Sequence, residues 1–161
     1  MDYRGYPIAE NHELFSKYLF PDKNAFVKFT KNKGLSPGEF EFCDTLFVGE
    51  NNPNHYKGKV VILVNEYTQS AAEFQVMAFQ TIPGAIVIGP GTSGADGNIS
   101  WVPLPFGYKT AFSGIGVFYP DGRETQGSGI IPDIKIFQTL HGIKNGKDEI
   151  LEKAINYIKD F

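Results

Sequence analysis

Residues 58–89 read "GKVVILVNEYTQSAAEFQVMAFQTIPGAIVIG", which has the pattern of a strand, a helix and a second strand. The apolar run at 60–64 is unbroken, as in a parallel strand that is covered on both faces. A helix is expected from about Ser70 to Gln80, and "GAIVIG" at 84–89 predicts a second short buried strand. Connections of this kind are right-handed in nearly all proteins. The stretch therefore predicts an α/β fold.

Further elements are expected on both sides of this unit. Apolar residues at helical spacing predict a helix that starts with Asn11 as N-cap and stops at Pro21. An amphipathic pattern predicts a terminal helix within 145–161. Alternating or apolar runs predict strands at 25–31, 99–104, 107–113, 115–119 and 131–137. We expect one α/β domain with a mixed sheet over residues 1–161, truncated at its N-terminus because "MDYRGYP" looks like the end of a strand.

The composition fits a globular domain with an apolar core, since 42% of the 161 residues are hydrophobic and 14% aromatic. The formal net charge is −3, with both signs mixed along the chain, so neither nucleic acid nor an anionic membrane is expected as a partner. No apolar run reaches about 18 residues, and we expect no membrane insertion. The oligomeric state and the cellular compartment stay open.

Metal and cofactor chemistry is not indicated by the residue pattern. Cys43 is the only cysteine, which excludes an internal disulfide and a Cys-based metal cluster. His12, His55 and His141 share no metal-ligand spacing and are interpreted as surface or loop residues. The glycine-rich segment "GPGTSGADG" at 89–97 matches neither a phosphate loop nor the dinucleotide fingerprint. We therefore expect no metal and no cofactor.

Ser70 has two interpretations from the local pattern. It follows a buried strand and opens a helix, where free N–H groups and the helix dipole would stabilise a developing alkoxide or oxyanion. That position suits a nucleophile. However, "SAAE" at 70–73 is also a capping box, in which Ser70 and Glu73 satisfy each other's backbone N–H groups. The local pattern contains no base, and both interpretations stay open at this point.

Five segments in order resemble the catalytic domain of the tail-specific, or C-terminal processing, serine peptidases and of the related tricorn core protease. They are "DYRGYP", "VVILVNEYTQSAAE", "GAIVIGPGTSGADG", "VFYPDGRETQGSGIIPDIKI" and "DEILEKAINYI". The most specific pieces are the serine in "T-x-S-A-x-E" and the later "G-I-x-P-D-I". The resemblance implies a crotonase-like ββα spiral fold. It also implies peptide or protein substrates that are cleaved through an acyl-enzyme on Ser70, without metal or cofactor.

The residues that would activate the serine depart from the family pattern. In the processing peptidases a lysine between two glycines is the general base, and here that position falls on Ala95 or Asp96, with the partnering glutamine position near Ser100. The tricorn branch instead uses serine, histidine and glutamate, and the chain is interpreted as nearer to it. The glutamate position aligns with Gln126, while Glu124 lies two residues earlier. We expect the histidine to come from a segment outside this sequence.

The resemblance also implies an oxyanion hole. One N–H would come from Ala71, and another from a family glycine pair that reads Ile8-Ala9 here. The bulky Ile8 is expected to reshape or half-close the pocket.

Three functions compete on this basis. The first is a serine peptidase domain whose base lies outside the sequence. The second is a catalytically decayed module that binds peptides or a partner protein by strand addition. The third is a crotonase-type enzyme acting on acyl thioesters, which would share the fold without needing Ser70. We favour the first and keep the second as the main alternative.

Overall fold

The computed structural model describes residues 1–34 and 38–160. Its centre is a parallel sheet with the strand order β4 (Val61–Leu63), β5 (Ile86–Gly89) and β9 (Ile134–Lys135). Asp2 forms a parallel bridge to Leu63, so the first residues lie along the outer edge of β4. The two apolar runs of residues 58–89 thus lie side by side in this sheet, as expected for strands that are covered on both faces.

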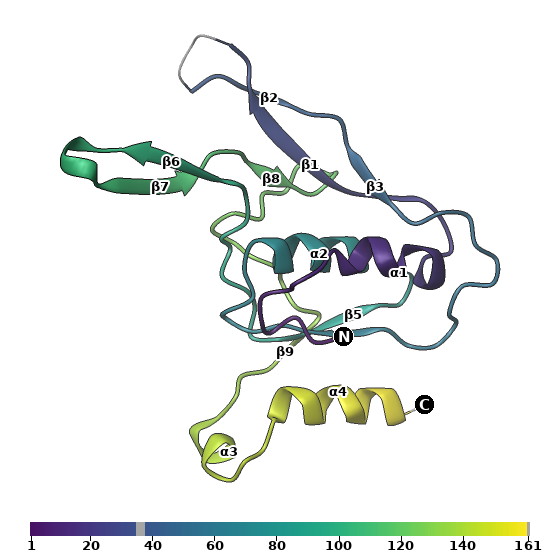
Figure 1. The fold of residues 1–161 in the computed structure, drawn as a ribbon. Helices are drawn as coiled ribbons and strands as arrows, with labels where there is room; N and C mark the ends of the chain where they lie inside the picture. Colours follow the sequence, from purple (N-terminus) through teal and green to yellow (C-terminus); the bar gives the residue numbers. More distant parts are fainter. Residues whose placement is uncertain (35–37, 161) are drawn as a thin grey trace.

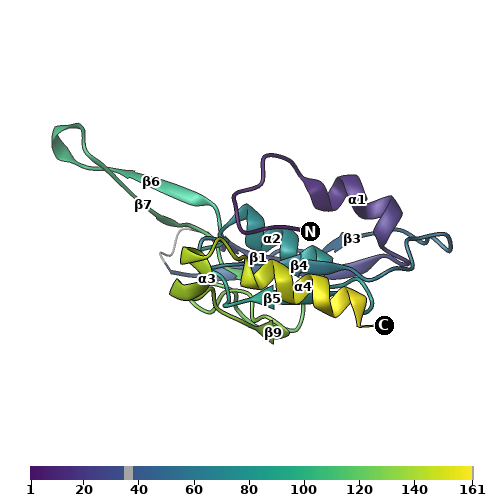
Figure 2. The same cartoon turned by 90° about the horizontal axis from the view of Figure 1, so that it is seen from below.

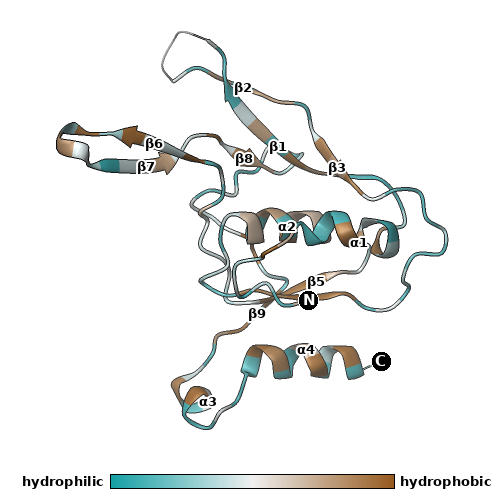
Figure 3. Cartoon of the chain, in the orientation of Figure 1, coloured by the Kyte–Doolittle hydropathy of each residue, from teal (hydrophilic) through white to brown (hydrophobic). Residues whose placement is uncertain are grey.

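Helices cover both faces of the parallel sheet (Figure 1). One face carries α2 (Ala71–Phe79) with α1 (Asn11–Leu19) beside it, and the other carries α4 (Glu149–Lys159). Strand side chains alternate accordingly, because Ile62 packs in the core with α2 whereas Leu63 packs with α4. In Figure 3, α4 carries both hydrophobic and hydrophilic colours, as a helix with one face on a sheet should. No helix in the described part of the chain is both long and apolar enough to cross a membrane.

A second, antiparallel sheet lies on the far side of α2 (Figure 1). Its long strand β1 (Asn24–Asn32) pairs with β2 (Phe40–Phe42), β3 (Leu46–Val48) and β8 (Val117–Phe118). Helix α2 is therefore enclosed between two sheets, and it buries even Glu73 and Gln75. Buried polar side chains need hydrogen-bond partners, and the partners of these two shape the site described below.

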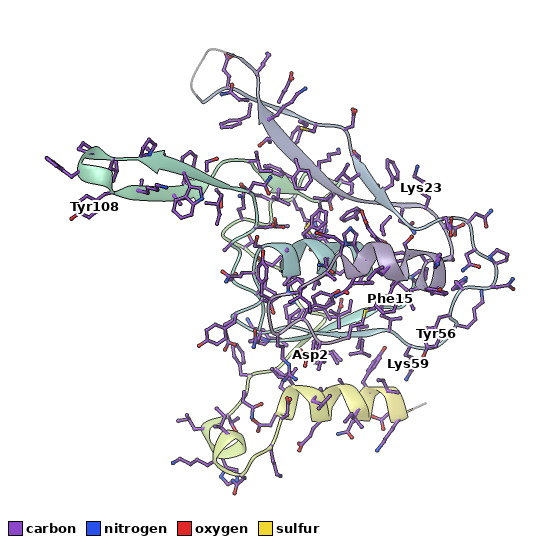
Figure 4. The ribbon with its side chains drawn as sticks, viewed as in Figure 1. Asp2, Phe15, Lys23, Tyr56, Lys59 and Tyr108 are labelled. Carbon is purple, nitrogen blue, oxygen red and sulfur yellow. The ribbon has the colours of Figure 1, made fainter. Side chains whose placement is uncertain are left out.

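Strands β6 (Ile99–Pro103) and β7 (Lys109–Ser113) form a hairpin that projects from the body (Figures 1 and 2). A short 3-10 turn over Pro105–Gly107 closes it, and Figure 4 shows Tyr108 near the free end. Within the described residues these strands pair only with each other. Large apolar side chains are exposed along the hairpin, namely Ile99, Trp101, Leu104, Phe106, Tyr108 and Phe112.

The expected α/β fold class is confirmed, with the parallel and antiparallel strands in separate sheets. The strand, helix, strand unit of residues 58–89 is present, although β4 spans only Val61–Leu63. The N-cap of α1 is Glu10 and not Asn11, and α4 starts after an Asp148 cap instead of near 145. The end of the expected terminal helix at residue 161 lies outside the described residues. Three short elements were not expected, namely β2, β3 and α3 (Leu140–Lys144).

Candidate active site

Ser70 lies at the junction between β4 and α2, in a backbone geometry that is unusual for serine. Its φ of +51° and ψ of −122° fall in a region that glycine adopts readily and that side chains disfavour. As the N-cap of α2, it borders the free N–H groups of the first helical turn, where negative charge is stabilised. Strained torsion angles at a serine between a strand and a helix are typical of nucleophile turns.

The buried carboxylate of Glu73 holds this turn in place. Its Oε2 accepts from the N–H of Ser70 at 3.1 Å and from the N–H of Ala95 at 3.0 Å. Its Oε1 accepts from the Thr92 hydroxyl at 2.5 Å and from the N–H of Gly94 at 2.8 Å. The capping box expected from the sequence is present, and Glu73 also fastens the glycine-rich loop to the Ser70 turn.

An open pocket of about 520 Å³ lies in front of this turn, at the base of the hairpin. It is lined by Tyr6, Gln69, Ser70, Ala95, Gly97, Ile99, Ala111, Phe112 and Ser113. Gly97 could not be another residue without rearrangement, because its φ is +101° and a Cβ would lie 2.8 Å from the carbonyl oxygen of Ile115. The pocket therefore combines the hydroxyl of Ser70 with apolar side chains from the hairpin.

Buried polar side chains bring the N-terminal segment to the Ser70 pocket. Thr68 Oγ1 donates to the carbonyl of Tyr3 at 2.8 Å, just before the serine. Gln75 Nε2 donates to the carbonyl of Ala9 at 2.9 Å, from within α2. Between these two anchors the segment places Tyr6 in the pocket lining.

Of the two residues expected to form the oxyanion hole, Ala71 lies beside Ser70, whereas the Ile8 side chain lies outside the pocket lining. Ala71 directly follows Ser70 as the first residue of α2, where amide groups lack partners within the helix. Ile8 is fully exposed and is not among the lining residues, so its side chain does not half-close the pocket. The Ile8 side chain faces solvent instead.

Gln126 and Glu124 do not line the Ser70 pocket. Gln126 Nε2 donates to the carbonyls of Asp96 at 2.8 Å and Ile115 at 2.9 Å, and Oε1 accepts from the N–H of Val117 at 3.3 Å. Its amide thus holds the glycine-rich loop to the start of β8. Glu124 is exposed and lines a separate pocket of about 340 Å³, which Gln126 also lines.

Asp96 is buried directly behind the pocket lining, between Ala95 and Gly97, with 5% of its surface exposed. Its Oδ1 accepts from the N–H of Gly97 at 2.7 Å, whereas Oδ2 has no hydrogen-bond partner among the described residues. Burial raises the pKa of Asp96 to about 6; the bond from Gly97 opposes this shift and the Glu73 carboxylate adds to it. Asp96 is one of the two residues that the sequence resemblance predicts at the lysine position of the processing peptidases.

Among the residues that the structure describes, no histidine or lysine lines the Ser70 pocket. The His55 ring lies near Lys57, and the His141 ring lies near Asn145, the C-cap of α3. The expectation that all three histidines lie at the surface or in loops was wrong for His12, which is buried in α1 against two phenylalanines. Over residues 1–34 and 38–160, no group of three or more His, Cys, Asp or Glu residues could hold a metal ion.

The model of peptidase family S41 matches residues 15–136, which is most of the chain. This chain belongs to peptidase family S41. The matched range includes Ser70, the glycine-rich loop and Gln126. The expected resemblance to the tail-specific serine peptidases is confirmed, while the preference for the tricorn branch stays a prediction. Among curated protein sequences, none matches this S41 chain.

Solved structures share the fold of this S41 chain. A candidate peptidase from Parabacteroides merdae ATCC 43184 has a TM-score of 0.81 at 22% identity, over 94% of this chain and 48% of that chain. Mature CPAF in complex with lactacystin has a TM-score of 0.72 at 15% identity, over 94% and 41% of the two chains. The photosystem II D1 C-terminal processing protease has a TM-score of 0.54 at 22% identity, over 74% of this chain and 29% of that chain. The chain thus spans less than half the length of each.

Proposed function

We propose that this S41 chain is a serine-type endopeptidase domain that cleaves peptide substrates through an acyl-enzyme on Ser70. The observation that carries the proposal is the Ser70 turn, in which a serine with positive φ begins a buried helix and lines an open pocket. Glycine would adopt this backbone conformation without strain, whereas serine does so at a cost in stability. A serine at this position therefore indicates that its hydroxyl is needed. Glu73 stabilises that conformation through buried hydrogen bonds.

The proposed reaction follows from this geometry. Ser70 Oγ attacks the substrate carbonyl carbon while a base takes the hydroxyl proton, and the same base then protonates the leaving amine. The tetrahedral oxyanion accepts from the Ala71 N–H at the start of α2, and a second donor is expected from the segment around Ile8. Water then attacks the acyl-enzyme and releases the second product.

The general base is proposed to come from outside these 161 residues, since the described residues that line the Ser70 pocket include neither lysine nor histidine. If that base is a histidine, Gln126 or Glu124 would orient it. Gln126 could do so only through Oε1, because both of its N–H groups are already used. Glu124 would have to turn from the neighbouring pocket, and as a carboxylate it would stabilise the imidazolium more strongly.

The alternative is a catalytically decayed module that binds a peptide or a partner protein. Two observations over residues 1–34 and 38–160 favour it. No lysine or histidine lines the Ser70 pocket, and the hairpin beside it has unpaired outer strand edges and exposed apolar side chains. Such an edge can accept an extended peptide as an additional strand.

A serine-directed fluorophosphonate probe distinguishes the two functions. A longer S41 protein that contains this chain and the base should label at Ser70, and its Ser70→Ala variant should not. The 161-residue chain alone should label far more slowly, since loss of the base typically costs about 10⁴ to 10⁶ in rate. Rapid labelling of the short chain would show that one of its own residues is the base. Absence of labelling in both would favour the binding module.

A further inference from the structure

A second pocket, of about 600 Å³, opens between α1, β1, β3 and α2. It shares no lining residue with the Ser70 pocket. Three aromatic rings contribute to its walls, Phe26 from β1, Phe47 from β3 and Phe74 from α2. None of its lining residues is a lysine or an arginine. The pocket therefore offers aromatic surface without a positive charge of its own.

His12 provides a buried polar atom in this pocket. The residue is only 6% exposed, and its ring centroid lies 5.9 Å from that of Phe26 and 5.2 Å from that of Phe74. Its Nδ1 has no hydrogen-bond partner among the residues that the structure describes. Burial lowers the pKa of His12, although the Glu10 and Glu13 carboxylates oppose the shift. A neutral imidazole with its proton on Nε2 leaves Nδ1 as a free acceptor.

Two carboxylates line the same pocket. Glu10 Oε2 lies 3.4 Å from His12 Nδ1, within ion-pair distance but without hydrogen-bond geometry, and the Glu10 side chain is 62% exposed. Glu13 is also exposed. Lys23 lies beside β3 (Figure 4), where its Nζ is 5.1 Å from the Phe47 ring centroid, but Lys23 is not a lining residue. The ring of Phe47 is thus already in contact with one cation of the chain itself.

We propose that this pocket binds an organic ammonium group with an apolar substituent. The Glu10 carboxylate, 3.4 Å from the buried His12 Nδ1, would turn outward so that the ammonium can donate to Nδ1. The ammonium would then lie near Glu10 and Glu13, while the substituent would pack against the phenylalanine rings. An anionic ligand would be repelled by the two carboxylates, and a neutral ligand would forgo their attraction. Small aromatic amines have this chemistry. The inference does not depend on the proposed peptidase function.

The test is an NMR titration of the ¹⁵N-labelled protein with 2-phenylethylamine, which is an ammonium ion at neutral pH. The neutral 2-phenylethanol and the anionic 3-phenylpropionate are controls of similar size. Saturable shifts are expected at amides of α1, of β3 and around Phe74 in α2. Binding should be about tenfold weaker for the alcohol and absent for the anion. Equal binding of all three compounds, shifts confined to other surfaces, or no saturation by about 10 mM amine would overturn the proposal.

Variants identify the groups that recognise the amine. Glu10→Gln/Glu13→Gln should weaken amine binding about tenfold. The charge-matched control, Glu66→Gln/Glu152→Gln, alters two exposed glutamates outside the pocket and should leave binding unchanged. His12→Phe should also weaken binding, and if that variant does not fold, the glutamine pair still decides the question. Equal affinity for the pocket variant and its control would contradict recognition of the ammonium charge.

Discussion

Ser70 combines a proposed chemical role with a backbone conformation that reduces stability. Ser70→Gly and Ser70→Ala both remove the hydroxyl, but only glycine adopts a φ of +51° without strain. The glycine variant should therefore be more stable than the alanine variant by about 1 kcal/mol in urea unfolding. If the alanine variant is at least as stable as the glycine variant, the Ser70 turn must adopt a different backbone conformation in solution.

Asp96 makes stability depend on pH in the direction opposite to most carboxylates. Its pKa is about 6 in the folded protein against an ordinary value of 3.8, so the folded state holds the proton more tightly. The free energy of unfolding should therefore fall as the pH rises through this window, by up to about 3 kcal/mol from this group. Asp96→Asn should abolish that fall. At pH values above 7, the variant should therefore have a higher melting temperature than the unaltered protein.

The control for this experiment is Asp44→Asn, which alters an exposed aspartate in the loop before β3. Melting temperatures of both variants and the unaltered protein would be compared from about pH 4 to pH 8. A stability difference between Asp96→Asn and the unaltered protein that stays constant over this range would rule out titration of Asp96.

At the scale of elements, Glu73 couples the start of α2 to the glycine-rich loop. Glu73→Gln replaces one acceptor oxygen with an NH₂ group that faces N–H donors, and it removes the charge from the remaining bonds. We expect a loss of about 3 kcal/mol in the free energy of unfolding. Amide hydrogen exchange of Gly94 and Ala95 should accelerate. Unchanged exchange at these two amides would show that the loop is held by other contacts.

Elements that consist of a continuous run of mostly apolar residues could be predicted from the sequence. Strands β4 and β5 and helix α2 are examples, because their apolar runs need no distant partner to be recognised. Strand β2 could not, since all of its residues are exposed and only pairing with β1 makes it a strand. Helix α3 was missed because it has a single buried residue over five positions.

The candidate site was predictable only in part, for the same reason. Ser70 and its capping partner Glu73 lie within one turn of helix and could be read together. The bonds from Glu73 to the glycine-rich loop, the burial of Asp96 and the placement of Tyr6 depend on segments far apart in the sequence. The solvent-facing side chain of Ile8 could not be inferred from its residue type.

For the molecule as a whole, the projecting hairpin carries the only tryptophan. Trp101 is 66% exposed, so its fluorescence should resemble that of tryptophan in water and change little when urea unfolds the body. Far-UV circular dichroism should show the unfolding transition over the same urea range. Blue-shifted Trp101 emission at low protein concentration would show that the hairpin folds back on the body. A blue shift that appears only at high concentration would show that a second copy covers it.

The parallel sheet brings residues 1–3 and β9 to opposite outer edges, with β4 and β5 between them. The N–H of Leu63 donates to the carbonyl of Met1, and the N–H of Tyr3 to the carbonyl of Leu63, both at 2.9 Å. A ribosome therefore produces one edge of this sheet long before the middle strands and the other edge long after them. Residues 1–3 remain without their pairing partner until Leu63 has emerged, and closing such distant contacts slows folding. Among the strands of this sheet, residues 1–3 therefore wait longest for their partner during synthesis, and they give a chaperone the longest time to bind.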